Sequence, residues 1–146
     1  MNNRYSTLQS YALLLVRLVV GSVFMLHGLQ KVFGLFGGPG LTGFATWIAS
    51  MGVPAFLGYA AALVELASGI MIFFGIATEL GAVLVIPLMK VAIYLVHWKN
   101  GYFIQNEGYE YALNLLLLAV ALIIGGPGAG ALWDPFKKWR ILKKSY

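Results

Sequence analysis

Residues 54–98 read PAFLGYAAALVELASGIMIFFGIATELGAVLVIPLMKVAIYLVHW and contain only three charged residues, Glu65, Glu79 and Lys90. A helix needs about 20 apolar residues to cross the hydrocarbon core of a bilayer, so this stretch is long enough for two crossings. The short Ala77-Thr78-Glu79 link divides it into expected spans at 54–78 and 79–98. Helices joined by so short a link must be antiparallel neighbours. The stretch therefore predicts a helical hairpin within a membrane.

Two further apolar stretches, at about 11–34 and 109–126, flank this hairpin. Gly-Gly-Pro-Gly sequences at 37–40 and 125–128 are turn signals that end them. The mixed segment 41–51 is expected to form a short interfacial helix or a re-entrant piece. The stretch at 11–34 is too long for the apolar region of a signal peptide and contains Arg17, so we expect a permanent span. Together these features predict an all-α, polytopic membrane protein, with one domain over 1–146 folded as an antiparallel bundle of four transmembrane helices.

The composition agrees with this class of protein. Of the 146 residues, 60% are hydrophobic and only 10% are charged, whereas soluble domains carry about 25% charged residues. There is no cysteine, which excludes a disulfide framework and a thiol nucleophile. The lipid bilayer is therefore the first expected partner of this chain.

The basic residues are concentrated at one end of the chain. The net charge is +5, and five of the ten Lys and Arg residues lie in the last ten positions. Basic segments flanking spans stay on the cytoplasmic side, so we expect 135–146 to be a basic cytoplasmic tail. An even number of spans then places both termini in the cytoplasm, with the chain in the cell membrane. No nucleic-acid-binding motif accompanies the tail, and lipid headgroups are its expected partners.

Polar and ionisable residues inside the spans are the candidates for ligand binding or proton relay, although none is assigned as catalytic. They are Arg17, His27, Glu65, Lys90, Tyr94, His97, Glu110 and Asn114. Such residues are costly in lipid and normally face the interior of a helix bundle. Lys90, Tyr94 and His97 follow one another at a spacing of i, i+4, i+7, which places them on one side of a helix. We therefore expect the whole set to meet in one protein-lined interior.

Counting from the span ends places Glu65 and Lys90 near the middle of the membrane. Arg17 is expected to reach Glu65 and to form a structural ion pair between two helices. Lys90 is then a second base without an acid. Three explanations stay open: a neutral Lys90, a Glu110 that reaches deeper, or an anionic or quinone-like ligand that completes the site.

A metal site is a weaker interpretation. His27, His97 and a carboxylate are ligand types that suit several transition metals. Their positions show no clustered spacing such as HExxH, so no metal site is predicted. Both histidines are equally consistent with a structural role at helix interfaces.

The order of motifs resembles that of the DoxX family of small four-helix membrane proteins. The likeness rests on RLVVGSVFMLHGLQKVF at 17–33, the turn at 37–40, ELASG at 65–69, GYEYALN at 108–114 and the Gly-Pro-Gly at 126–128. Family members often continue from Gly-Pro-Gly directly into Ser-Leu-Asp. Here Ala-Gly-Ala-Leu-Trp-Asp at 129–134 takes that place, so the resemblance covers the chain except for its end.

The resemblance implies a link to redox chemistry. The family takes its name from a subunit associated with a terminal quinol oxidase, and a related branch looks like the membrane subunit of a thiosulfate:quinone oxidoreductase. The first hypothesis is thus an integral membrane subunit of a quinone-linked redox system, with a quinone as its non-covalent cofactor and a redox protein or further copies of itself as partners. If it is an enzyme, it is an oxidoreductase subunit that acts on a quinone. The alternatives are a non-catalytic membrane scaffold and a small transporter.

Overall fold

The computed structural model describes residues 2–137, and this part of the chain is helical without a β-strand. The main helices are α1 (Asn2–Phe33), α2 (Gly40–Ser50), α3 (Ala55–Phe74), α4 (Thr78–Ala92) and α5 (Glu110–Gly125). Short helical turns join them: η1 (Leu35–Gly37), η2 (Ile93–His97), η3 (Trp98–Asn100) and η4 (Ile104–Asn106). The expected all-α class is confirmed. Of the expected basic tail, only residues 135–137 belong to the described part.

Three helical segments are long and apolar enough to cross a membrane, namely Ser6–Phe33, Ala55–Phe74 and Thr78–Asn100. The fourth expected span, 109–126, corresponds to α5, which is apolar but has only 16 residues. At 1.5 Å per residue α5 is about 24 Å long, somewhat less than a typical hydrocarbon core. The segment expected at 41–51 is helical, as α2. The chain is therefore a polytopic membrane protein, with one apolar helix shorter than predicted.

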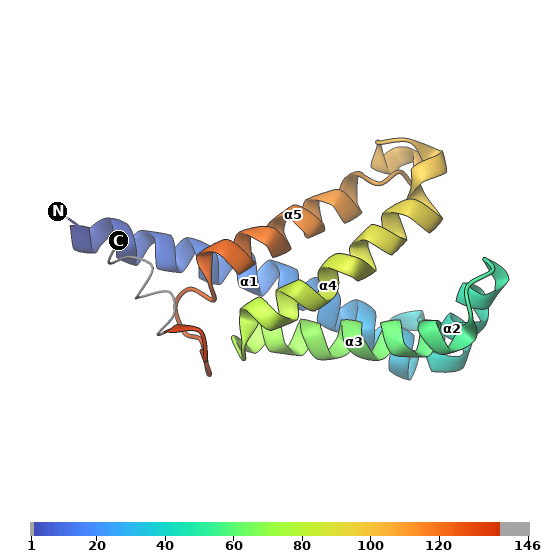
Figure 1. Ribbon diagram of the computed structural model, residues 1–146, viewed down its shortest axis with the longest axis horizontal. Helices are drawn as coiled ribbons and strands as arrows, with labels where there is room; N and C mark the ends of the chain where they lie inside the picture. Colours follow the sequence, from blue (N-terminus) through green and yellow to red (C-terminus); the bar gives the residue numbers. More distant parts are fainter. Residues whose placement is uncertain (1, 138–146) are drawn as a thin grey trace.

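The four apolar helices alternate in direction along the chain, in the order α1, α3, α4 and α5 (Figure 1). Glycines allow α1 and α3 to approach each other closely. A Cβ atom at Gly21 would collide with the backbone of Phe73, and one at Gly28 would collide with the backbone of Leu66. From the other side, a Cβ atom at Gly69 would collide with Met25. Small residues at such crossings are a common means of packing helices in lipid, where the hydrophobic effect does not drive association.

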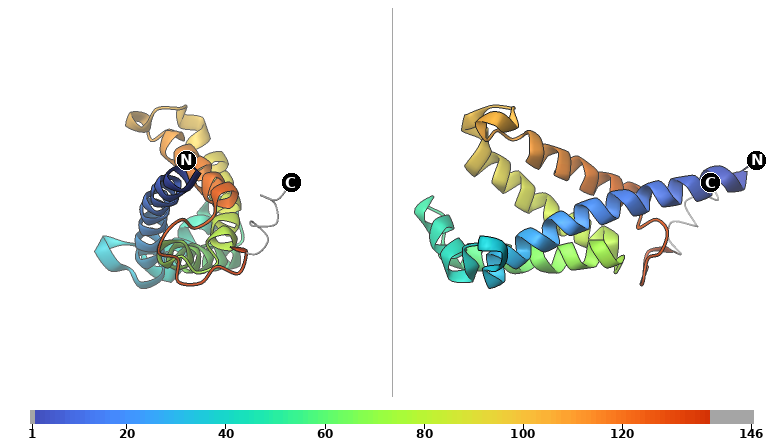
Figure 2. Two further views of the ribbon diagram at one scale, coloured as in Figure 1. Left: turned by 90° about the vertical axis from the view of Figure 1, so that its left-hand side faces the viewer. Right: turned by 180° about the vertical axis from the view of Figure 1, so that it is seen from behind.

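The α4–α5 hairpin lies close to α1 and α3 at one end of the molecule and moves away from them toward the other (Figures 1 and 2). We call these the converging end, formed by residues 75–78 and 126–134, and the diverging end, formed by residues 34–54 and 93–109. The segment after α5 closes the converging end. Its Trp133 exchanges backbone hydrogen bonds with Gly75 and Ala77, at 3.0 and 2.9 Å, and Ala129 N donates to Ser10 O at 3.0 Å.

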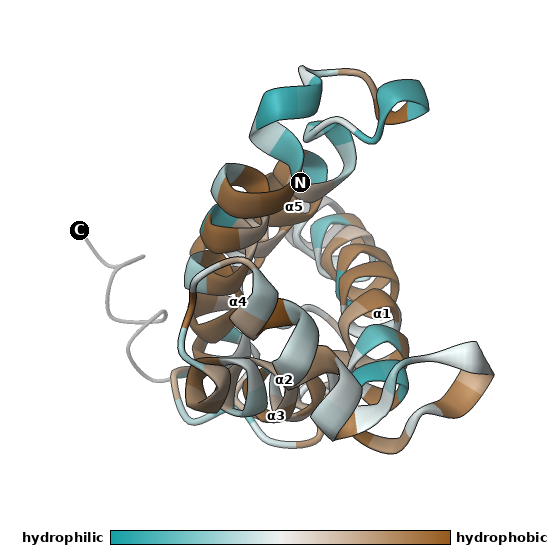
Figure 3. Ribbon diagram, turned by 90° about the vertical axis from the view of Figure 1, so that its right-hand side faces the viewer, coloured by the Kyte–Doolittle hydropathy of each residue, from teal (hydrophilic) through white to brown (hydrophobic). Residues whose placement is uncertain are grey.

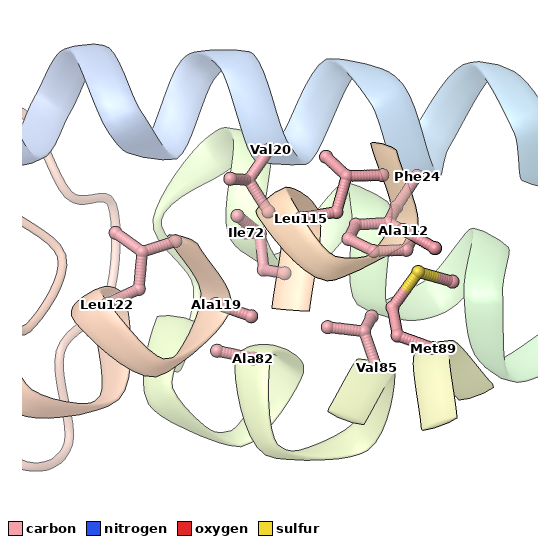
Figure 4. Packing of buried hydrophobic residues seen from close by; sticks show 10 residues of the cluster. All are labelled: Val20, Phe24, Ile72, Ala82, Val85, Met89, Ala112, Leu115, Ala119 and Leu122. Carbon is pink, nitrogen blue, oxygen red and sulfur yellow. The ribbon is translucent and has the colours of Figure 1, made fainter. Parts of the chain in front are cut away.

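The buried apolar core lies where the helices are still close together (Figure 4). It contains Val20, Phe24, Ile72, Ala82, Val85, Met89, Ala112, Leu115, Ala119 and Leu122. Hydrophobic residues also cover most of the outer helix surfaces, while strongly hydrophilic ones gather on the loop after α4 and near the end of α1 (Figure 3). Apolar side chains on both sides of a helix are what a lipid surrounding requires.

Helix α4 continues past Pro87 to Ala92 and then widens into the π-helical turn η2. Proline has no N–H, so the usual hydrogen bond to the carbonyl of Val83 is missing. A π turn adds one residue to a helical turn and so rotates the side chains that follow it. Such turns occur frequently at functional positions.

Candidate functional site

An ion pair between Lys31 of α1 and Glu65 of α3 is the main polar contact between the long helices. Lys31 Nζ donates a hydrogen bond to Oε2 of Glu65. Glu65 is only 4% exposed, whereas the Lys31 side chain remains 24% exposed. The same ammonium group lies 4.8 Å from the ring centroid of Phe44 in α2, within the range of a cation–π contact. A buried carboxylate is thus neutralised by a lysine that is still open on one side.

The local sequence explains why these two groups meet. Gly28 allows α1 to touch α3 at Leu66, the residue after Glu65. Lys31 follows Gly28 by three residues and so lies on nearly the same side of α1. Close packing of the two backbones therefore brings the lysine opposite the carboxylate, and Phe44 covers the pair from α2.

Arg17 does not pair with Glu65, so the predicted ion pair is wrong. Its Nη1 donates to Pro127 O at 3.1 Å and its Nη2 donates to Gly130 O at 3.3 Å. The depth estimate failed because it placed α1 in the wrong register against α3. Gly21 lies against Phe73, near the end of α3, so Arg17, one turn earlier on α1, lies beyond that end. Arg17 and Lys31 are separated by about 21 Å along the helix, and it is Lys31 that lies at the level of Glu65.

Arg17 instead holds the segment after α5 against α1 at the converging end. It is 3% exposed, and both of its hydrogen bonds go to backbone carbonyls. Its Nε is buried and has no hydrogen-bond partner among residues 2–137. A guanidinium group can bind two acceptors at once because its donors form a rigid fork. This geometry gives Arg17 a structural role in the described part of the molecule.

His27 is exposed, contrary to the expectation of a buried position. It lies on the side of α1 that carries Val20 and Phe24, which pack against α4 and α5. Because the α4–α5 hairpin moves away beyond Phe24, this side of α1 is uncovered at His27 (Figure 2). His27 is one turn before Lys31, so the two side chains are neighbours on the helix surface. We refer to His27, Lys31 and Glu65 as the α1–α3 polar cluster.

Lys90 and Tyr94 face away from the core, which contradicts the expectation of one shared interior. Lys90 is exposed, and Tyr94 is 74% exposed. Both lie on the side of α4 opposite Val85, which is fully buried. In the part of the chain that the structure describes, Lys90 forms no ion pair with a carboxylate.

His97 and Glu110 organise the loop that follows α4. His97 Nδ1 lies 2.7 Å from Glu107 O, and Asn100 Nδ2 donates to the same carbonyl at 3.3 Å. A carbonyl oxygen can only accept, so Nδ1 of a neutral His97 carries the hydrogen and Nε2 is free to accept. The backbone N–H of Ile104 donates to Glu110 Oε2 at 3.0 Å.

The predicted residues therefore divide into separate groups. We call α1 with α3 one arm of the molecule and the α4–α5 hairpin the other arm. The α1–α3 polar cluster lies on the first arm, and His97 and Glu110 lie on the second. Asn114 is exposed on α5. The set of His27, His97 and a carboxylate considered for a metal is not assembled, and no three His, Cys, Asp or Glu side chains gather as a metal site requires within residues 2–137.

Sequence reasoning missed the partner of Glu65 and the ring that covers it. Lys31 is not among the predicted site residues, and Phe44 belongs to the mixed segment 41–51. One usable signal was present, because Lys31 follows His27 by one turn and Gly28 by three residues. The contact with Phe44 depends on how α2 folds back, which no local pattern indicates.

Comparison with known proteins identifies relatives of the chain. The family model described as DoxX matches residues 12–98, which include the α1–α3 polar cluster and Lys90 but not Glu110 or Asn114. The chain is also 36% identical over 123 residues to the protein named "Putative oxidoreductase CatD" of Bacillus subtilis (strain 168), with 84% of each chain covered. No solved structure is significantly similar.

Proposed function

Because the chain belongs to the DoxX family, we propose that it is the integral membrane subunit of a quinone-linked redox system. The α1–α3 polar cluster is the proposed binding place of the quinone headgroup. The observation that carries the proposal is Lys31, which is held by the buried Glu65, remains partly exposed and lies one turn from an exposed His27. The oxidoreductase name of the relative supports a redox role.

The donors present in the cluster suit a quinone headgroup. A quinone presents two carbonyl oxygens as acceptors, and the quinol presents two hydroxyls. Lys31 has three N–H donors, of which one is used by Glu65. An imidazole can donate to one oxygen or accept from a hydroxyl. The Phe44 ring next to the ammonium adds an apolar surface beside these polar groups.

Each residue has a separate part in the proposed reaction. A quinone takes up two electrons and two protons, and the electrons come from a donor substrate or a redox partner protein. Lys31 stabilises negative charge on the reduced oxygen, and Glu65 fixes the position of the ammonium group. His27 supplies the two protons one after the other, and its exposed ring is reprotonated between the two transfers. His97 and Glu110, once expected to relay protons, lie on the other arm and take no part.

Binding of a short-chain quinone to the purified protein in lipid nanodiscs tests the proposal. His27→Phe and the double variant Lys31→Met/Glu65→Leu are expected to weaken binding about 10-fold or more, because each removes one donor to the headgroup. The double variant leaves no buried carboxylate unpaired, so it keeps the fold. His27 is exposed, so its replacement leaves the fold intact. Quenching of the intrinsic tryptophan fluorescence is a suitable readout.

Lys90→Met is the matched control. It removes the same positive charge from a different helix, on the side of α4 that faces away from the core. It is expected to leave quinone affinity unchanged. Wild-type affinity in both His27→Phe and Lys31→Met/Glu65→Leu would refute the proposed site, as would an equal loss in all three variants.

A non-catalytic membrane scaffold is the second candidate, because the Lys31–Glu65 pair also joins two helices. The double variant Lys31→Glu/Glu65→Lys separates the two roles. A scaffold keeps its assembly function when the pair is reversed and the fold is retained. A quinone site loses binding, because a carboxylate then occupies the position that faces the carbonyl oxygen.

A further inference from the structure

One side of α4 carries polar groups although no other part of the described chain covers it. Val83, Pro87, Lys90 and Tyr94 follow one another at i, i+4, i+7 and i+11, and all four are exposed. We call this stripe the Lys90 face. The opposite side of α4, which contains Ala82, Val85 and Met89, belongs to the core.

Lys90 lies too deep in the span to reach the membrane surface. The helical stretch Thr78–Asn100 is one of the three segments that can cross a bilayer. Lys90 is twelve residues from its first residue and ten from its last, which corresponds to about 18 and 15 Å. Both distances exceed the length of an extended lysine side chain. The ammonium group therefore cannot be neutralised by lipid phosphates in the way that lysines near span ends are.

The acids of this chain are also unsuitable as partners of Lys90. Glu65 is paired with Lys31, and Glu110 accepts a hydrogen bond from Ile104. Glu107 lies in the loop beyond the span, and Glu79 stands at the start of α4. Asp134 lies near that same end, because it follows Trp133, which hydrogen-bonds to Gly75 and Ala77. An acid that pairs with Lys90 therefore has to come from outside the described chain, at the depth of Lys90.

A second copy of the chain does not supply that charge. A symmetric pair formed through this face would set each Lys90 near the Lys90 of the other copy, because an isologous interface brings identical patches together. Two like charges in lipid repel strongly. Charge complementarity thus favours a different protein with an acidic residue.

We propose that the Lys90 face binds a transmembrane helix of another membrane protein, and that this helix carries an Asp or Glu near the middle of its span. The face offers further polar groups to such a helix. Pro87 leaves the carbonyl of Val83 without its usual helical donor, and the Tyr94 hydroxyl can donate or accept. Polar contacts of this kind hold helices together in membranes. The inference is independent of quinone binding at the α1–α3 polar cluster.

Designed transmembrane peptides provide a direct test. A labelled Leu- and Ala-rich peptide with one central Glu is reconstituted in bilayers with the full chain. The chain contains no cysteine, so a donor dye can be attached at Gln105→Cys alone. Energy transfer is expected to show binding of the Glu peptide at least 10-fold tighter than that of an otherwise identical Gln peptide.

Three variants complete the experiment. Lys90→Met is expected to reduce binding of the Glu peptide to the level of the Gln peptide. Lys90→Glu is expected to prefer a peptide with a central Lys, which reverses the selectivity. Lys99→Met is the matched control, because this exposed lysine follows the same helix but lies at its end, and it is expected to change nothing.

Equal binding of the Glu and Gln peptides would overturn the proposal. So would Glu-peptide binding that persists in Lys90→Met. Energy transfer between copies of the chain that is lost in Lys90→Met would show that the face joins identical subunits, and this outcome would also refute it.

Discussion

Lys31 and Glu65 illustrate how one polar contact can serve both stability and chemistry. Glu65 is buried in α3 and accepts a hydrogen bond from Lys31, which remains partly exposed. A buried carboxylate without a partner is strongly unfavourable, since desolvation penalises its charge. The fold of α1 and α3 therefore depends on Lys31, and the exposed part of the same ammonium group is available for a ligand.

Removing only the lysine should destabilise the protein. Lys31→Met leaves Glu65 buried and unpaired, and breaking one partner of a buried pair costs roughly 3–5 kcal/mol. The double variant Lys31→Met/Glu65→Leu should regain most of this loss, because an apolar pair of similar volume needs no neutralisation. Unfolding free energies measured in mixed detergent micelles check both values. A double variant as unstable as Lys31→Met would contradict this account.

At the scale of elements, the approach of α1 to α3 positions the polar cluster. The two helices touch through Gly21, Gly28 and Gly69, each of which lies against backbone atoms of the facing helix. Backbone cannot move aside as a flexible side chain can. The register of α1 against α3, and with it the alignment of Lys31 and Glu65, is therefore sensitive to any added atom at these positions.

Gly28→Ala should accordingly destabilise the fold, although alanine is the better helix former. The added methyl group would overlap Leu66, and overpacking of this kind typically costs about 1–3 kcal/mol. Gly43→Ala is the comparison, because its methyl group would meet only the side chain of Pro39, at 3.2 Å. Thermal unfolding in detergent should show a lower midpoint for Gly28→Ala and little change for Gly43→Ala. Equal midpoints would argue against a tight interface.

At the scale of the whole molecule, the separation of α1 and α3 from the α4–α5 hairpin decides which residues are exposed. Near the converging end all four helices share one apolar core. Toward the diverging end the α4–α5 hairpin moves away from α1 and α3 (Figure 1), and residues such as His27 are exposed. The polar residues of the two arms therefore act separately.

Hydropathy and turn residues were sufficient to predict the helices, but they could not predict the directions in which polar side chains point. The expected spans at 54–78 and 79–98 overlap the apolar helical segments Ala55–Phe74 and Thr78–Asn100. Lys90 was assigned to the interior because buried charges usually face a bundle. The 3.6-residue period of a helix shows that Lys90 and Tyr94 share one side. In a membrane helix both sides are apolar, so the same period does not tell which side faces the core. The pairing of Glu65 depended on the register of α1 against α3, which the close contact of Gly28 with Leu66 sets.

The orientation in the membrane stays a prediction and can be tested by labelling. Basic residues near both termini favour a cytoplasmic converging end. Because the natural chain contains no cysteine, single cysteines can be introduced at the exposed positions Gln105 and Lys137. A membrane-impermeant maleimide should label Gln105→Cys in intact cells and Lys137→Cys only after permeabilisation. The reverse pattern would place the termini outside.

The contacts of Arg17 also bear on how the chain is synthesised. Its acceptors, Pro127 O and Gly130 O, follow it by 110 and 113 residues. The arginine thus leaves the ribosome long before the carbonyls that will receive it. During elongation the first helix must keep this guanidinium in contact with water or with the insertion machinery. Its burial becomes complete only when the segment after α5 has been made, so that this late segment secures the first helix.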